Sequence, residues 1–369
     1  MDELHLADLR IAESYDALPY ETPDDPALRP RTLLGFGGVF GCAGAFADVL
    51  DLGCGTGVQL AAAAQEMEGR LTGVDLSRAN CRRAEERLAP FGARVRLHEA
   101  DLLDLDAEAL GRFDLIYAVG LVFAVPPAVR AHVLRLIGAC LKPGGVALIT
   151  HYGGMLPEAR RWVHRLIRAE MPPGLAPAEA AAKGRQALKR LLPRLETSPL
   201  MRDAARLSLS LPDSTFFHEV FNPFVEPVPV RELDRALEET DVRFLGHLDA
   251  PPLLPGGDAA ARARDADAQD LAGGAYHYAL FGKGARTPDL IAPHVAWQTP
   301  LRSAGGVQYR FAEGAEPVQV LHAPTRAALD ALAQGPRPLL EVLPPQQREV
   351  SLRLFADLWA RRLVTPLRR

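Results

Sequence analysis

The stretch Asp51–Gly57 reads Asp-Leu-Gly-Cys-Gly-Thr-Gly and joins two segments of different character. It overlaps Val49–Leu52, a short apolar run that favours a buried strand. It is followed by Val58–Glu68, whose many alanines favour a helix. A glycine-rich turn lets the backbone approach a ligand closely, and the helix N-terminus behind it presents free N–H groups. The junction therefore predicts a ligand site between a strand and a helix.

Strand and helix patterns continue to alternate downstream of this junction. Apolar runs predict strands at Leu71–Val74, Val95–His98, Phe113–Val119 and Val146–Thr150, with helices at Arg78–Leu88 and Pro127–Leu141 between them. Such alternation predicts an α/β fold with a parallel sheet. Two later candidates, Val242–His247 and Tyr276–Phe281, are expected to complete a seven-stranded, Rossmann-like sheet. The predicted sheet domain therefore covers residues 48–154 and 241–284.

The remaining segments are expected to surround this domain. Residues 1–47 predict a cap or lid, with a short helix near Leu33–Phe40. Residues 155–240 predict a helical insertion, with helices at Glu158–Glu170, Pro177–Leu192, Ser198–Leu209 and Pro229–Thr240. The composition of Pro251–Ala275 predicts a flexible loop. Residues 285–369 predict a small winged-helix-like domain, with strands at Val307–Phe311, Val318–Leu321 and Leu363–Pro366 and helices at Ala328–Leu332 and Arg348–Ala360.

The residues around the glycines indicate which ligand the site takes. A dinucleotide fingerprint needs a third glycine where Val58 stands, so that pattern fails. Asp51 would repel a pyrophosphate, but it suits the α-amino group of S-adenosylmethionine. Asp75 ends the next strand, about 20 residues on, where a ribose diol is read. Asp101 ends the third strand and could accept from an adenine amino group.

These motifs resemble those of the class I S-adenosylmethionine-dependent methyltransferases. Arg112–Ile116 and Leu141–Gly145 are similar to further stretches of that family. The resemblance implies a methyltransferase that binds S-adenosylmethionine, with the following residues near the cofactor: Tyr15, Asp51, Gly53, Cys54, Gly55, Gly57, Asp75, Leu76, Ala100, Asp101, Leu102 and Val119.

A narrower resemblance is to methyltransferases with a predicted methyltransferase regulatory domain, which include rickettsial-type protein lysine methyltransferases. Ser14–Tyr20, Gly120–Arg130 and Phe216–Glu219 carry it. The sequence departs from that group at Val119, at Ala124 and in the segment 151–154, which should border the acceptor. The expected acceptor-side residues are Tyr15, Tyr20, His151, Tyr152, His218 and Glu219.

Three functions remain open at this point. The resemblance implies methyl transfer to a lysine side chain of a protein. A lysine with a pKa of about 10.4 costs roughly 4–5 kcal/mol to deprotonate at neutral pH, so such an enzyme should desolvate its acceptor. The first alternative is a small-molecule or peptide O- or N-methyltransferase in a biosynthetic pathway. The second is a cofactor-binding regulatory protein whose C-terminal module contacts nucleic acid.

Composition and the absence of certain sequence patterns exclude several partners and cellular locations. The net charge of -4 lacks the basic footprint of nucleic-acid binding. The four cysteines have no metal-type spacing, so no metal site is expected. The N-terminus is acidic without an apolar run, and no apolar run approaches a membrane span. A cytoplasmic protein without membrane partners is therefore expected, whose C-terminal module could contact either the substrate or a second copy in a homodimer.

Overall fold

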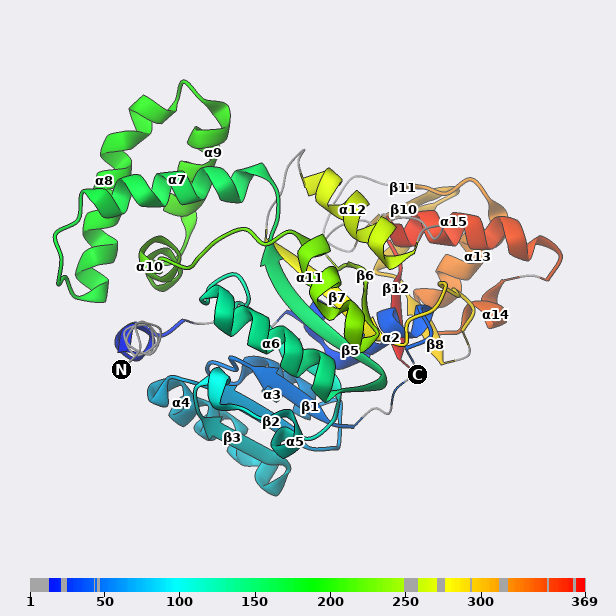
Figure 1. The fold of residues 1–369 in the computed structure, drawn as a ribbon. Helices are drawn as coiled ribbons and strands as arrows, with labels where there is room; N and C mark the ends of the chain where they lie inside the picture. The colour runs from blue at the N-terminus through cyan, green and yellow to red at the C-terminus, as the bar shows by residue number, and fades with distance from the viewer. Residues whose placement is uncertain are drawn as a thin grey trace.

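The computed structural model describes residues 13–20, 25–42, 44, 47–248, 258–270, 276–292, 294–311, 318–343, 345–360 and 363–368. Its centre is a seven-stranded sheet in the order β3-β2-β1-β4-β5-β7-β6 (Figure 1). The strands are β1 Val49–Leu52, β2 Leu71–Asp75, β3 Val95–Glu99, β4 Phe113–Ala118, β5 Leu141–Tyr152, β6 Val242–His247 and β7 Tyr276–Lys283. All neighbours are parallel except β7, which runs antiparallel to both β5 and β6. The Rossmann-like sheet and the closing role of the two late strands are thus confirmed.

Alternate residues of the central strands pack on opposite faces of the sheet, because side chains alternate along a strand. Leu115 and Tyr117 of β4 belong to one apolar cluster, and Ile116 and Ala118 belong to the other. The first face is covered by α2 (Pro30–Val39), α3 (Val58–Ala64) and α4 (Arg78–Leu88). The second is covered by α5 (Ala107–Leu110), α6 (Pro127–Cys140), α11 (Val230–Leu237) and α12 (Ala259–Asp270). The result is a sheet with helices on both faces.

The helical insertion has an apolar core of its own. Its helices are α7 Met155–Ala169, α8 Pro177–Leu195, α9 Pro199–Ser210 and α10 Asp213–Phe221. Val163 and Ile167 of α7 pack with Leu188 of α8 and Phe216 of α10. The sequence patterns did not predict the helix α10. The next helix, α11, packs on the sheet and not in this core.

The expectation of a flexible loop over Pro251–Ala275 is wrong in its middle. Ala259–Asp270 forms α12, whose Ala263 and Ala266 are buried against the sheet. Arg262 extends from the same helix and donates to the carbonyl of Phe244 in β6. Alanine and arginine are good helix formers, and this preference outweighs the proline and glycine that flank the segment. Residues 251–257 and 271–275 lie outside the described residues.

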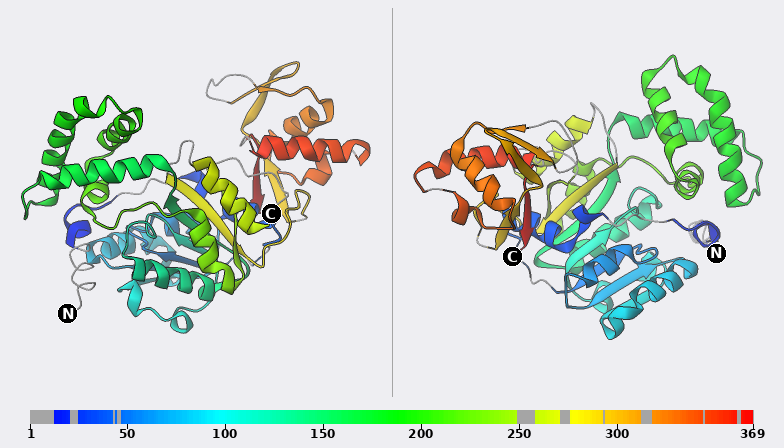
Figure 2. Two further views of the ribbon diagram at one scale, coloured as in Figure 1. Left: turned by 45° about the horizontal axis from the view of Figure 1, so that its top comes forward. Right: turned by 180° about the vertical axis from the view of Figure 1, so that it is seen from behind.

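The described residues of the C-terminal part form two small sheets and three α-helices. The strands are β8 Val295–Gln298, β9 Leu301–Gly305, β10 Gln308–Phe311, β11 Val318–Gln319 and β12 Thr365–Arg368, and the helices are α13 Ala323–Leu332, α14 Leu339–Val342 and α15 Arg348–Ala360. One sheet has the order β11-β10-β9, and the other pairs β12 with β8. Figures 1 and 2 show these elements and the helical insertion at opposite ends of the molecule.

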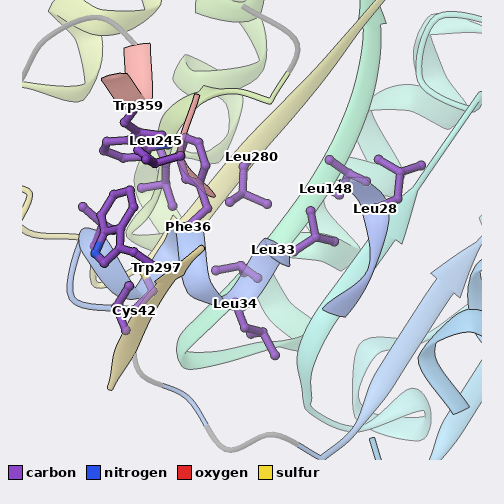
Figure 3. Close-up of a cluster of buried hydrophobic side chains, with 14 of the residues drawn as sticks. Leu28, Leu33, Leu34, Phe36, Cys42, Leu148, Leu245, Leu280, Trp297 and Trp359 are labelled. Atoms are coloured by element: carbon purple, nitrogen blue, oxygen red, sulfur yellow. The ribbon is translucent and has the colours of Figure 1, made fainter. Parts of the chain in front are cut away.

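Helix α2 joins the C-terminal elements to the central sheet. Phe36 packs on Trp359 at 5.1 Å between ring centroids, and Trp359 packs on Trp297 at 5.4 Å (Figure 3). A Cβ atom on Gly35 would lie 2.5 Å from the backbone of Leu367 in β12, so only glycine permits this approach. The sheet, α2 and the C-terminal elements therefore share one apolar cluster. Within the described residues, every helix is too short or too polar to span a bilayer.

Candidate active site

The glycine loop leaves β1 in left-handed backbone conformations. The φ angles of Gly53, Gly55 and Gly57 are 71°, 52° and 75°, values that L side chains rarely adopt. A Cβ atom on Gly57 would lie 3.1 Å from Leu88 and 3.2 Å from Ala84 of α4, whereas one on Gly55 would meet nothing within 4 Å. Gly57 thus serves the packing of α3 on α4, and Gly55 presents bare backbone to a cavity.

Asp75, at the end of β2, holds this loop in place. Its Oδ2 accepts from the backbone N–H of Gly55 at 2.8 Å, and its Oδ1 accepts from that of Ser77 at 2.9 Å. Burial raises the pKa of Asp75 in spite of these hydrogen bonds. The carboxylate therefore connects the glycine loop to the start of α4 while it also lines the cavity.

Asp51, at the end of β1, is 1% exposed, and its Oδ2 has no hydrogen-bond partner among the described residues. Burial, and secondarily the carboxylate of Asp75, raises the pKa of Asp51 to about 8. A buried carboxyl oxygen without a partner is costly, and a cationic group would satisfy it. This environment fits the α-amino group of S-adenosylmethionine, although Asp51 is absent from the residues that line the cavity.

A cavity of about 530 Å³ extends from the glycine loop to the helical insertion. Its walls include thirteen of the residues that the sequence predicts for the site. These are Tyr15, Tyr20, Gly53, Cys54, Gly55, Asp75, Leu76, Asp101, Leu102, Val119, Tyr152, His218 and Glu219. Asp51, Gly57, Ala100 and His151 are not among the lining residues. One cavity therefore joins the predicted cofactor side to most of the predicted acceptor side.

Asp101 has a structural role in addition to its place in the cavity wall. Its Oδ1 accepts from the backbone N–H of Leu103 at 2.9 Å and caps the short 3₁₀ helix Leu102–Asp104. The cap fixes the carboxylate at the end of β3, and a carboxylate has lone pairs for further donors. The position is compatible with the predicted contact to an adenine amino group.

A buried polar cluster forms the cavity wall at the insertion. The hydroxyl of Tyr152, at the end of β5, donates to Oε1 of Glu219 at 2.7 Å. Nη2 of Arg160, from α7, donates to Oε2 of the same carboxylate. The Arg160 guanidinium also lies 5.4 Å from the centroid of the Tyr152 ring. All three side chains are buried, and sequence reasoning missed Arg160 although it falls among the apolar positions of an amphipathic helix.

Aromatic rings surround this cluster on the cavity side. The ring centroid of Tyr152 lies 4.5 Å from that of Phe123 and 5.3 Å from that of Tyr276. Burial, and then the Glu219 carboxylate, raises the pKa values of Tyr152 and Tyr20. Burial is also the main cause of the raised pKa of Tyr276, to which Glu219 contributes. These phenols therefore stay protonated at neutral pH and can donate hydrogen bonds.

The N-terminal segment 13–20 bridges the two sides of the cavity. The ring of Tyr15 stacks on that of His218 with centroids 4.0 Å apart, and Nε2 of His218 lies 2.6 Å from the carbonyl oxygen of Leu18. At the sheet side, Oδ1 of Asp16 accepts from the hydroxyl of Ser77 and from the N–H of Ala79. Burial lowers the pKa of His218, so this ring is neutral at pH 7. The predicted cap over the site is therefore fastened to the sheet domain and to α10.

His151 contradicts its predicted place at the acceptor. Its side chain is fully buried, its Nδ1 lies 2.9 Å from the carbonyl oxygen of Val228, and its Nε2 lies 2.8 Å from Nε2 of His247. The ring of His277 lies 5.4 Å away on the neighbouring strand. Since successive side chains of a strand face opposite sides, Tyr152 reaches the cavity and His151 does not.

Comparison with known proteins identifies the central domain. Residues 49–145 match a family model described as a methyltransferase domain. The uncharacterized protein RP028 of Rickettsia prowazekii is 32% identical over 143 residues, which cover 37% of this chain and 57% of that protein. The uncharacterized protein RP789 of the same organism is 28% identical over 142 residues, or 37% of this chain and 26% of that protein. The match thus spans about half or less of these relatives' own length.

Solved structures extend the similarity to nearly the whole fold. The structure of PKMT2 from Rickettsia typhi superposes with a TM-score of 0.76 and 18% identity over 94% of this chain and 77% of that chain. Its complex with AdoHcy gives the same TM-score with 19% identity, over 95% of this chain and 77% of that chain. The sheet, the insertion and the C-terminal elements therefore form a fold that already has a solved counterpart.

Proposed function

We propose that this chain, whose residues 49–145 form a class I methyltransferase domain, transfers methyl groups from S-adenosylmethionine to lysine side chains of a protein. The observation that carries the proposal is the single cavity lined by the glycine loop and Asp75 at one end and by Tyr152 and Glu219 at the other. A donor and an acceptor bound in such a cavity would meet within it. Holding two reactants in line can contribute up to roughly 7–11 kcal/mol to catalysis.

The residues at the first end fit the donor. Gly55 offers bare backbone, Asp75 can accept from ribose hydroxyls, and the unpartnered oxygen of Asp51 suits the α-amino group. When bound, S-adenosylmethionine supplies a methyl group on a positively charged sulfur, which is a good leaving group. The protein's own task is then to orient the acceptor and to exclude water.

The other end suits an amine that must lose its hydration shell. Tyr20, Tyr152 and Tyr276 line it together with apolar side chains of the sheet domain and the insertion. Burial of an ammonium in such surroundings lowers its pKa and so favours the neutral amine that attacks. The fold shared with PKMT2, including the insertion, supports a protein as the source of that amine.

A small-molecule O- or N-methyltransferase is the second candidate. The cavity volume of about 530 Å³ lies within the range of small-molecule sites, roughly 300–1,000 Å³. Such an acceptor would lie between Phe123 and the insertion, inside the cavity. It would not require a second protein to dock on the surface.

Incubation with labelled S-adenosylmethionine and a cell lysate separates the two candidates. We expect label in the protein fraction, released on acid hydrolysis as methylated lysine. Label confined to small molecules would exclude a lysine acceptor and favour the second candidate. The Gly55→Val variant, which fills the donor end of the cavity, serves as the unlabelled control.

A further inference from the structure

The polar cluster of Tyr152, Arg160 and Glu219 contains a buried ion pair, which methyl transfer does not by itself require. Glu219 sits at the centre, with one carboxylate oxygen bound by the Tyr152 hydroxyl and the other by Arg160. It is 8% exposed and Arg160 is 5% exposed, so this is a buried ion pair at a cavity wall. A buried carboxylate without a cation is strongly unfavourable. Arg160 therefore supplies the cation that compensates the Glu219 carboxylate at the cavity wall.

The carboxylate has unused capacity toward the cavity. Each of its oxygens accepts one hydrogen bond in the structure, and each has a second lone pair. The side chain influences four cavity tyrosines, since it contributes to the raised pKa values of Tyr15, Tyr20, Tyr152 and Tyr276. Glu219 is thus a hydrogen-bond acceptor set among aromatic rings. Such surroundings suit an amino group, because the carboxylate accepts hydrogen bonds from its N–H groups while the apolar rings keep water away from it.

We propose that Glu219 binds the amino group of the acceptor, and that Arg160 is the positioning residue that holds its carboxylate at the cavity wall. This inference rests on the proposed methyl transfer and names the residue that selects the acceptor. An N–H of the amine donates to Glu219, which leaves the nitrogen lone pair free to face the methyl group. An ionised carboxylate or a thioether could not make that contact, since neither has a proton to donate.

Arg160 contacts the Glu219 carboxylate and lines the cavity, whereas Arg168 of the same helix does neither. Arg168 lies on the same helix and donates to the backbone carbonyl of Val220, beside Glu219, but it does not line the cavity. It therefore provides a control that disturbs the contact between α7 and α10 without touching the carboxylate. The Tyr152 hydroxyl cannot replace the guanidinium, because it donates a hydrogen bond but carries no charge.

The test uses the full chain and the acceptor labelled in the lysate experiment. Glu219→Gln keeps the shape and removes the charge, so we expect the KM for the acceptor to rise about tenfold or more, while the affinity for S-adenosylmethionine, measured by calorimetry, stays within twofold. An unchanged KM for the acceptor would overturn the proposal. Absence of any transfer by the wild-type chain would instead contradict the proposed function.

A comparison of KM between matched variants isolates the role of Arg160. In Arg160→Met the carboxylate loses the guanidinium that positions it, so we expect the KM for the acceptor to rise about tenfold while the affinity for S-adenosylmethionine stays within about twofold. Arg160→Lys retains a positive charge and should restore much of the wild-type KM, and Arg168→Met should leave it unchanged. An equal rise in Arg160→Met and Arg168→Met would show a merely structural role and refute the assignment. If Arg160→Met fails to fold, Arg160→Met combined with Glu219→Gln removes both charges and should show the same KM as Glu219→Gln alone.

Discussion

The two ends of the cavity are assembled in different ways. The donor end joins residues close in the chain: the N–H of Gly55 meets the carboxylate of Asp75 across 20 positions. The acceptor end joins distant residues: Arg160 meets Glu219 across 59 positions, Tyr152 meets it across 67, and His218 meets the carbonyl of Leu18 across 200. The contacts of the donor end can therefore be predicted from the sequence. Those of the acceptor end depend on how the insertion and the N-terminal segment pack.

The largest effect is expected at the donor end, from Gly55→Val. The valine side chain would enter the cavity, so we expect the affinity for S-adenosylmethionine to fall about 100-fold or more, which corresponds to at least about 2.8 kcal/mol. Calorimetric titration measures this loss.

Gly92→Val is the matched control for that change. Gly92 also has a positive φ, 56°, and open space around its Cβ position, but it lies outside the cavity. Both variants should lose stability, because a β-branched side chain rarely adopts a positive φ. Equal binding by the two variants would disprove the donor site.

The second effect concerns protons at Asp51. Because the pKa of this carboxyl is raised to about 8, the group is protonated in the free protein at lower pH, whereas the α-ammonium of the donor favours its ionised form. Binding should therefore release close to one proton near pH 6.5, and the affinity should rise up to about tenfold per unit between about pH 5.5 and pH 7. Calorimetry in buffers with different ionisation enthalpies measures the release.

Asp51→Asn should abolish both the proton release and the rise in affinity. Proton release that persists in this variant would place the linked group elsewhere, and the role of Asp51 toward the amino group would be excluded.

The third effect separates two neighbouring residues of β5. His151→Leu removes the hydrogen bonds to the carbonyl of Val228 and to the ring of His247, so we expect a loss of about 1–3 kcal/mol in the free energy of unfolding. Methyl transfer by the folded variant should stay within twofold of wild type. Tyr152→Phe, one residue on, removes a hydrogen bond from Glu219 at the cavity wall and should slow the transfer in the folded variant, as steady-state kinetics would show.

The smallest effect is expected at the N-terminal segment. His218→Ala removes a ring stack worth about 0.5–1.5 kcal/mol and a hydrogen bond worth about 1 kcal/mol. Amide hydrogen exchange over residues 13–20 should therefore become faster by roughly tenfold. Phe221→Ala, which alters α10 away from this segment, should leave that exchange unchanged. Equal acceleration in both variants would mean that the segment responds to the insertion as a whole.

The sheet could be predicted from local sequence patterns, and the same patterns led to the residues that gather at the glycine-loop end of the cavity. Apolar runs of four to seven residues predicted the seven strands. Asp51 lies near the end of β1, Asp75 is the last residue of β2, and Asp101 stands two residues after β3. The failures have physical causes. The helix Ala259–Asp270 was obscured by flanking prolines and glycines, and His151 was assigned to the cavity without regard to the alternation of its strand. Arg160 was missed because its partner, Glu219, lies on another helix and becomes adjacent only in the folded insertion.

The close approach of α2 to β12 has a consequence for dissecting the chain. The backbone of Leu367 lies so close to Gly35 that a side chain at this position would not fit. Phe36 of the same helix packs against Trp359. The apolar face of α2 that covers the sheet is thus continuous with the one that covers the C-terminal helix. A fragment that stops after β7 would carry the complete sheet and the whole cavity lining, yet it would expose these aromatic rings to water. A fragment made for activity measurements should therefore include the C-terminal elements as well as the sheet domain.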